Sequence, residues 1–592
     1  MAKGFDTLHI KSAVKTRNKF DLSRAHLTTM NFGEIVPLFS EETVPGDDIK
    51  VKASYFSRMA PLVKPTYGKF SFKTMAAFVP YHQVAEDFDG WVAGKNVFEG
   101  ENTKFRCFTV ETLVSFILFG CSSSLVTSVN ANVQNSDFTF IGADGVTGYR
   151  LFTDKGRYFF KVLNSLGYAL PQGTNLQTGS TWYKTVAQEK LSAYPLLAFF
   201  KAYNDYMSQS QRFNISALSA FLRGVKQGKN VGGYDASNGN LSYVGLSLMF
   251  DNLFLCYDND YFTSAWRYPT SPLGVGTEPQ LYQSSVPASA YELVENNNQY
   301  VDLNSVRTDG SEFQISQRAL DWLKSFDAWV RRNNYSGSRA VQQIYSRFGI
   351  KTDDYKTHYA HILGSNSTPI QVGDVTSTSD ATGATLGEYA GKGIMNGGDG
   401  FSVKADDYGL FVILGWFTVS PMNAYGFDRK VLRNTPLDYF TPEFDGIGAE
   451  AISAGEYFTN PTISSSADTT SDLDVYGYTE RYNSYRYGRD LITGEFRGMR
   501  NDDNKNVWHT GRLLTDVRQA GNLLAQAPSV INMSQSASEY NRIFSITDGS
   551  VDTFYLTCNF NVDAVRPMMS LNQVPQLGEG NTVVPRNGNT VN

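Results

Sequence analysis

The residue types best suited to catalysis or metal binding do not fall into a recognised pattern in this chain. His358 and His361 form an H-x-x-H pair, which on a helix would present two imidazoles to a metal ion. Catalytic zinc takes three protein ligands and a water molecule, and no third ligand follows at a diagnostic spacing. The pair is therefore better explained as part of a surface turn.

Two pairs of acidic residues offer the oxygen atoms that calcium prefers. Asp258 and Asp260 form one pair, and Asp502 and Asp503 form the other. Neither pair follows the order of ligands in a twelve-residue EF-hand loop. We therefore expect no cofactor, and an incidental calcium ion at a subunit contact is the one metal that the sequence leaves open.

Nucleophile and phosphate motifs are also missing from the sequence. There is no G-x-S-x-G elbow, and no serine or cysteine is joined to a histidine by a local signature. The glycine-rich residues 391–400 match neither phosphate-binding pattern, so we expect a flexible loop there. We expect no enzyme, although the acid pair of a glycosidase is set in space and leaves a glycan-cleaving or glycan-binding protein as an alternative.

The cysteines and the hydropathy pattern point to a protein made in the cytoplasm. No C-x-x-C spacing occurs, so we expect reduced and mostly buried thiols. Residues 1–20 lack the apolar core of a signal peptide, and the apolar run at residues 113–120 is too short to span a bilayer. We therefore expect neither export nor membrane insertion. The four cysteines are Cys107, Cys121, Cys256 and Cys558.

Composition indicates a large folded body with a basic beginning. The 592 residues carry a formal charge of −6, and 14% of them are aromatic, enough for a large core or wide subunit interfaces. Residues 1–30 hold six basic and two acidic side chains, so this arm suggests a contact with phosphates. A solvated tail is the alternative. The candidate nucleic-acid contacts are Lys11, Lys15, Arg17, Lys19 and Arg24.

Alternating hydrophobicity predicts β-structure at both ends of the chain. Residues 49–55, 70–78 and 554–562 alternate apolar and polar side chains, as half-buried strands do. Residues 410–419 form a continuous apolar run, which suits a strand covered on both faces. These strands predict a sandwich or a barrel.

Helices are the minority, and long polar stretches separate the predicted elements. Apolar residues recur at helical spacing in residues 311–334, and a second helix is expected from Pro195 to Gln209 with proline in its first turn. Polar, glycine-rich stretches of this length usually carry function or contact other molecules. We expect long loops at residues 97–160, 214–255, 270–311, 364–400 and 445–475.

Several long segments resemble the major capsid protein of the Microviridae, the small icosahedral bacteriophages with single-stranded DNA, and the gokushovirus pattern most of all. The segments lie in the same order as in that family and extend from one end of the chain to the other. They are residues 31–84, 166–173, 195–207, 260–269 (DYFTSAWRYP), 338–358, 369–379, 408–421, 428–448, 476–497, 506–509 (NVWH) and 559–571.

The resemblance implies a mainly β fold, an eight-stranded antiparallel jelly roll with long inserted loops and a few packing helices. It implies an internal basic arm at residues 1–30 and a single capsid domain at residues 31–592, with insertions at the five stretches given above. The implied function is a T=1 shell around circular single-stranded DNA. The implied location is the virion, assembled in the cytoplasm of the bacterial host.

The implied partners are other copies of the chain, the packaged DNA, a small basic internal DNA-binding protein, a scaffolding protein and a receptor on the host cell. Gokushoviruses carry a large insertion where residues 270–311 are short, whereas residues 97–160 and 214–255 are enlarged. We therefore expect the latter two stretches to supply any host contact. A phage spike protein remains an alternative to the shell protein.

Overall fold

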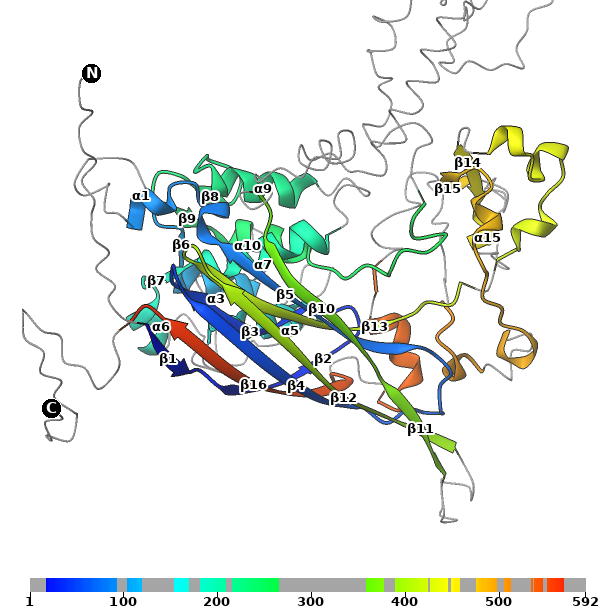
Figure 1. Cartoon of the computed structure of the whole chain (residues 1–592), viewed down its shortest axis with the longest axis horizontal. Coiled ribbons are helices and arrows are strands. Elements are labelled where there is room, and N and C mark those ends of the chain that lie inside the picture. The colour runs from blue at the N-terminus through cyan, green and yellow to red at the C-terminus, as the bar shows by residue number, and fades with distance from the viewer. Residues whose placement is uncertain are drawn as a thin grey trace, which may run out of the picture.

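Two antiparallel sheets packed face to face form the centre of the computed structural model (Figure 1). The large sheet contains β1 (Asn18–Asp21), β2 (Arg24–Met30), β16 (Phe554–Arg566), β4 (Asp48–Met59), β12 (Tyr389–Lys404) and β11 (Gln371–Thr376). The small sheet contains β3 (Val36–Thr43), β13 (Gly409–Val419), β5 (Phe70–Pro80) and β10 (His361–Pro369).

The structure describes a little over half of the chain. The described residues are 17–92, 104–119, 154–169, 181–208, 216–265, 358–376, 389–423, 426–445, 449–457, 475–497, 505–512, 534–535, 537–546 and 551–568.

The strands pair in a nested order that identifies the topology. β2 pairs with β16, β3 with β13, β4 with β12, and β5 with β10, all antiparallel. The early strands thus pair with the late strands in reverse order, and further pairs (β16 with β4, β13 with β5) join them into the two sheets. This is the topology of a jelly roll. The expected fold class, mainly β with a jelly roll at its centre, is confirmed.

Aromatic side chains from the two sheets meet in the core between them. The rings of Phe417 on β13 and Phe554 on β16 stack with centroids 4.0 Å apart. Tyr55 on β4 meets Phe72 on β5 at 5.4 Å in an edge-to-face contact. Because such pairs add to the burial of apolar area, this aromatic seam holds one sheet against the other.

Helices cover the other face of the small sheet (Figure 1). α5 (Asp154–Ser165) packs on β3, and α7 (Tyr194–Tyr206) packs on β5 and β13. The Tyr158 hydroxyl accepts a hydrogen bond from the Ile35 amide at 2.8 Å and donates to the Ile35 carbonyl at 3.1 Å. The small sheet is thus buried on both faces, which explains the continuous apolar sequence of β13.

The expected strands and one expected helix are present. β4, β5, β13 and β16 cover the four predicted stretches, and α7 begins one residue before Pro195. The helix predicted at residues 311–334 lies outside the described residues, as does the stretch 270–311.

Two of the expected loops contain helices instead. Residues 97–160 include α3 (Val110–Phe119), and residues 214–255 include α9 (Ser216–Lys226) and α10 (Tyr243–Asp251). In α9, Leu218, Phe221 and Val225 recur at helical spacing and are almost completely buried. The periodicity of these apolar residues would have indicated a helix, whereas the polar composition that we used led to the wrong prediction of a loop.

The expected loop at residues 364–400 is largely strand. It contains most of β10, all of β11 and most of β12, so it belongs to the two sheets and is not an insertion. Glycine occurs in β12 partly because other side chains fill the space beside it. A Cβ atom on Gly393 would lie 2.1 Å from the Met59 sulfur. The prediction of a flexible loop at residues 391–400 is therefore wrong.

Part of the expected basic arm is also strand. β1 and β2 cover residues 18–21 and 24–30, and both pair with β16 in the large sheet. The jelly roll therefore begins about twelve residues before the boundary that we placed at residue 30. Residues 1–16 lie outside the described part.

A side lobe lies beyond the end of the sandwich, coloured yellow to orange in Figure 1. It consists of the described residues 426–445, 449–457 and 475–497. β14 (Ala449–Ser453) pairs with β15 (Val475–Glu480), and α15 (Ala454–Tyr457) follows β14. β14 and α15 fall within the loop expected at residues 445–475, and the remainder of that loop is outside the described residues, apart from Asp445 and the first residue of β15.

Shorter elements complete the fold. The helices are α1 (Phe88–Val92), α6 (Thr181–Val186) and α18 (Ala537–Tyr540), and a minor sheet is formed by β6 (Cys107–Thr109), β7 (Lys190–Ser192), β8 (Tyr234–Asp235) and β9 (Asn240–Leu241). The described cysteines Cys107, Cys256 and Cys558 are buried thiols outside disulfide bonds, as expected. None of the helices in the described ranges has the length and apolar character needed to cross a bilayer.

Candidate nucleic-acid interface

The large sheet has one face against the core and one face exposed, which we call the open face. Along β4, each buried residue from Ile49 to Met59 alternates with an exposed one, and β16 continues the same pattern. The helices lie on the far side of the small sheet (Figure 1). The open face comprises Lys19, Asp21, Leu27, Lys50, Lys52, Ser54, Phe56, Arg58, Asn396, Gly398, Gly400, Ser402, Tyr555, Thr557, Asn559, Asn561 and Asp563.

Strand register places these side chains in rows across the sheet. Lys52 on β4 lies between Asn561 on β16 and Gly400 on β12. The neighbouring row contains Asn559, Ser54 and Gly398 in the same order. Each of these two rows has a glycine at its β12 position. The backbone of β12 is therefore not covered by side chains there, and it lies next to the asparagine amides and the Lys52 ammonium.

The open face carries three basic side chains that form no ion pair within the described part of the chain, together with two acidic side chains. Lys50, Lys52 and Arg58 are the exposed basic residues. Asp563 lies directly across from Lys50 in the strand register, and Asp21 lies across from Asp563. Lys19 on β1 differs, since its ammonium is 2.8 Å from a carboxylate oxygen of Asp563. Three cations therefore remain available to phosphate groups.

Apolar and aromatic side chains are exposed on the same face. Leu27 is 78% exposed, Phe56 40% and Tyr555 43%. The Arg58 guanidinium lies 5.4 Å from the centre of the Phe56 ring. Exposed rings beside cations are what proteins use to stack the bases of single strands, because every base presents a flat π-face.

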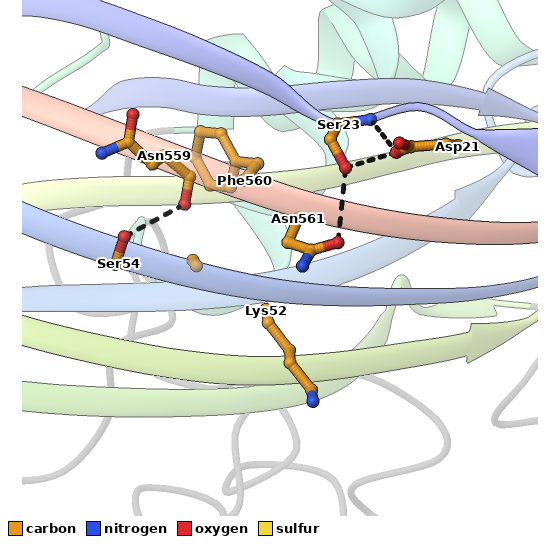
Figure 2. Close-up of a pocket in the computed structure, with 8 residues that line it drawn as sticks. Asp21, Ser23, Lys52, Ser54, Asn559, Phe560 and Asn561 are labelled. Atoms are coloured by element: carbon orange, nitrogen blue, oxygen red, sulfur yellow. Dashed lines mark hydrogen bonds between the residues drawn. The ribbon is translucent and has the colours of Figure 1, made fainter.

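A shallow pocket of about 480 Å³ opens on this face where β1 ends and β2 begins (Figure 2). The Ser23 amide donates to Asp21 Oδ1 at 2.9 Å, and the Ser23 hydroxyl donates to both Asp21 and Asn561. Lys52 extends from β4 at the pocket edge (Figure 2). Hydrogen bonds from Ser23 lower the pKa of Asp21, so its carboxylate stays ionised and fixes the turn between the two strands.

Four of the five predicted arm residues divide into three groups. Lys19 lies on the open face, where it is paired with Asp563. Arg17 is exposed and lies beside Gly46, whereas Lys11 and Lys15 fall outside the described residues. A contact between the arm and DNA therefore stays a prediction.

Arg24 has a structural environment that differs from our expectation of a free cation. Its guanidinium is 2.9 Å from a Glu41 carboxylate oxygen and lies 4.2 Å from the centre of the Phe39 ring. Glu41 neutralises its charge and Phe39 holds its position. Among the five candidates, Arg24 is therefore the residue that links β2 to β3.

The sequence did not identify the open face as a site. It showed that Lys50 and Lys52 alternate with buried residues, but it could not show which strands lie beside them. The available signal was the cluster of lysine, arginine and phenylalanine on the polar side of residues 50–58.

The metal-ligand candidates are engaged in local contacts. Asp258 binds the Lys73 ammonium at 2.6 Å, and Asp260 Oδ1 accepts from the amides of Phe262 and Thr263 at 2.9 and 2.7 Å. His361 begins β10 with its ring 5.6 Å from that of Phe78. Within the described ranges, no group of three or more histidine, cysteine or acidic residues is placed to hold a metal ion.

Similar proteins come from three bacterial viruses. The capsid protein VP1 of Chlamydia phage 1 is 21% identical over 601 aligned residues, which cover 94% of this chain and 95% of the relative. VP1 of Bdellovibrio phage phiMH2K is 23% identical, with 86% and 87% covered. VP1 of Spiroplasma virus 4 is 21% identical, with 83% and 84% covered.

A protein-family model gives the same result over most of the sequence. The model described as capsid protein (F protein) matches residues 8–112 and 178–577, which include all strands of both sheets. These matches agree with the jelly-roll pairing and with the resemblance seen in the sequence. The chain therefore belongs to the capsid protein (F protein) family of the Microviridae.

Proposed function

We propose that this chain assembles into a T=1 icosahedral shell that encloses a circular single-stranded DNA genome. The observation that carries the proposal is the family match over residues 8–112 and 178–577, because members of this family are structural capsid proteins. Every copy in a closed shell is held by several symmetry-related neighbours, so individually weak contacts give a stable container.

The open face is the surface that we propose faces the genome. The small sheet is covered by the large sheet on one side and by helices on the other, so the large sheet offers the exposed side of the jelly roll. Lys50, Lys52 and Arg58 supply positive charge, and Phe56 and Tyr555 supply rings. This combination binds a single strand without requiring a particular base sequence.

The remaining partners are part of the same proposal. Residues 97–160 and 214–255 contact the host receptor, a small basic internal protein shares the neutralisation of the DNA, and a scaffolding protein assists assembly in the host cytoplasm. The family supports neither a glycan-active enzyme nor a spike, the two alternatives that the sequence left open.

Cryo-electron microscopy of particles from infected cells tests the shell. We expect closed particles of one size whose wall contains this chain, with the open face directed inward. Closed particles that lack this chain in their wall would contradict the proposal.

A truncation separates the arm from the open face. Removing residues 1–16 leaves β1 and β2 intact, whereas a longer deletion would remove strands of the large sheet. If Lys11 and Lys15 bind the genome, the truncated particles contain less DNA per shell than the wild type, measured by absorbance at two wavelengths. Unchanged DNA content would exclude a role for these two lysines.

A further inference from the structure

Exposed apolar side chains are concentrated in the side lobe. Of the twenty large apolar residues that are well exposed within the described ranges, eight lie there. Of the other twelve, Leu27, Phe56 and Tyr555 lie on the open face, and the rest are distributed over other parts of the described chain. A concentration of this kind marks a surface that meets another molecule. The eight are Phe427, Val431, Tyr439, Phe440, Phe444, Tyr485, Leu491 and Phe496.

Several of these residues form a continuous cluster with two arginines. The Phe440 ring lies 5.3 Å from that of Tyr482 and 6.2 Å from that of Tyr485. The Arg433 guanidinium lies 3.9 Å from the centre of the Tyr485 ring, and the Arg481 guanidinium lies 5.0 Å from that of Phe444. We call these six residues the lobe cluster. Phenylalanine, tyrosine and arginine are enriched at the centres of protein interfaces.

The described contacts between the lobe and the rest of the protein are made by residues outside the cluster. Tyr487 stacks on Tyr261 at 5.0 Å, and Tyr457 packs against Phe262 at 5.1 Å. A third such contact joins Phe496 to Tyr67 at 6.3 Å. The lobe itself is held by Arg429, whose guanidinium binds Glu450 at 2.6 Å and Glu456 at 2.8 Å. Figure 1 shows the lobe standing away from both sheets and from the helical layer.

The charges around the cluster suit contact with an identical chain. Arg486 pairs with Asp445 at 2.8 Å and lies 3.6 Å from Glu480, and all three side chains keep 31% to 48% of their surface exposed. A rim that carries both signs can meet its own copy with acid opposite base, whereas a rim of one sign would repel it. In a shell, a second copy is always close by.

We propose that the lobe cluster is a contact between neighbouring subunits, in which the exposed rings of Phe440 and Tyr485 are buried against a second copy of this chain. The inference rests on the proposed function, since it assumes a shell. Arg433 stacks on the Tyr485 ring and Arg481 on the Phe444 ring, and the mixed charges at the rim set the orientation of the two copies.

Two acidic substitutions test the contact, each expressed in the phage that carries the full chain. Phe440→Glu and Tyr485→Glu put a charge on exposed positions of the lobe cluster, while Val92→Glu at the end of α1 is the matched control, since Val92 is also exposed. We expect each lobe variant to reduce the yield of closed particles at least about tenfold, as loss of about 1.4 kcal/mol at one contact would do. The control keeps the wild-type yield.

Two further measurements separate the outcomes. Thermal unfolding of each unassembled variant establishes that the subunit is folded, and the density of wild-type particles shows directly whether Phe440 touches a neighbour, with no substitution needed. Normal assembly of the lobe variants, together with a solvent-exposed cluster in the density, would overturn the interface. Normal assembly with lost adsorption to host cells would also overturn it and assign the cluster to a ligand on the cell surface. Wild-type particles without this chain would overturn the shell itself.

Discussion

A buried ion network shows how single residues tie the parts of the jelly roll together. The Lys161 ammonium on α5 lies 2.6 Å from Glu34 and 2.9 Å from Asp552, and the Asn31 side chain donates to Asp552 at 2.8 Å. Glu34 is only 8% exposed. The network joins the helical layer to the end of β2 and the start of β16. Breaking a buried pair from one side leaves a charge without compensation.

We predict that Lys161→Met destabilises the folded subunit by about 3–5 kcal/mol, because the Glu34 carboxylate loses its counter-ion inside the protein. The free energy of unfolding from urea titration measures this. Lys229→Met changes an exposed lysine in the same way and is the control. A loss below 1 kcal/mol for Lys161→Met would show that the network is solvated.

The same network predicts a pH dependence. Burial raises the pKa of Glu34, and the attraction of Lys161 offsets this only in part. A raised pKa means that the folded protein binds a proton at a pH where the unfolded chain has lost it, so stability rises as the pH falls toward about 4.3. We predict that the wild type gains stability relative to Glu34→Gln between pH 7 and pH 5, measured by urea unfolding at each pH.

Glu443→Gln is the control for this titration, since Glu443 is exposed. It removes one carboxylate and changes the net charge of the chain by the same amount as Glu34→Gln. If Glu34→Gln follows the wild type at every pH, the raised pKa of Glu34 is contradicted.

At the scale of elements, β12 shows why a strand can have the composition of a loop. It contains several glycines, and some of them lie where a neighbouring element comes close. Gly393 faces Met59, and a Cβ atom on Gly397 would lie 2.7 Å from the Thr368 hydroxyl on β10. At Gly400, in contrast, a Cβ atom would meet no atom within 4 Å. The physical reason for the presence of glycine therefore differs from one position of β12 to the next.

We predict opposite effects for two alanine substitutions in β12. Gly393→Ala should destabilise the subunit by about 1–3 kcal/mol, because the new methyl group overlaps Met59 in a packed core. Gly400→Ala should be neutral or stabilising by about 0.4–1 kcal/mol, since it restricts the unfolded chain without a clash. Urea midpoints of the two variants measure the difference. Equal midpoints would contradict the packing at Gly393.

These elements also show what the sequence could predict. Ile49, Val51 and Tyr55 alternate with polar residues, so β4 and its buried face were predictable. The apolar run of β13 predicted a strand that is covered on both faces. β2 was missed because Leu27 is exposed, which breaks the alternation. The open face was not predictable either, because it depends on the register of Asn561, Lys52 and Gly400, residues far apart in the chain.

At the scale of the whole molecule, the open face carries three cations although the chain is acidic. The formal charge is −6, yet Lys50, Lys52 and Arg58 lie on the open face. In the shell that we propose, basic groups on a face directed inward would neutralise phosphates.

We predict that the triple variant Lys50→Gln, Lys52→Gln and Arg58→Gln weakens binding of single-stranded DNA and reduces its salt dependence. For single strands each phosphate contact adds about 0.7 to the slope of log K against log salt, so losing three contacts should reduce the slope by about 2. Fluorescence anisotropy of a labelled oligonucleotide at several salt concentrations measures it.

A second triple variant has the same change in net charge. Lys190→Gln, Arg223→Gln and Lys229→Gln alter exposed residues of β7 and of α9 and its C-terminal turn, elements that lie away from the open face. Its slope should equal that of the wild type. If the slope of log K against log salt falls by the same amount in both triple variants, DNA binding depends on net charge and not on the residues of the open face.

The nested pairing of strands has a consequence for synthesis. β16 lies in the middle of the large sheet, between β2 and β4, although it follows β4 by almost 500 residues in the chain. At about 5–20 residues per second, translation takes about 25–100 s to pass from β4 to β16. For that time β2 and β4 have no partner at their facing edges, and unpaired edges promote aggregation. Each subunit therefore needs these two edges shielded until β16 has been made.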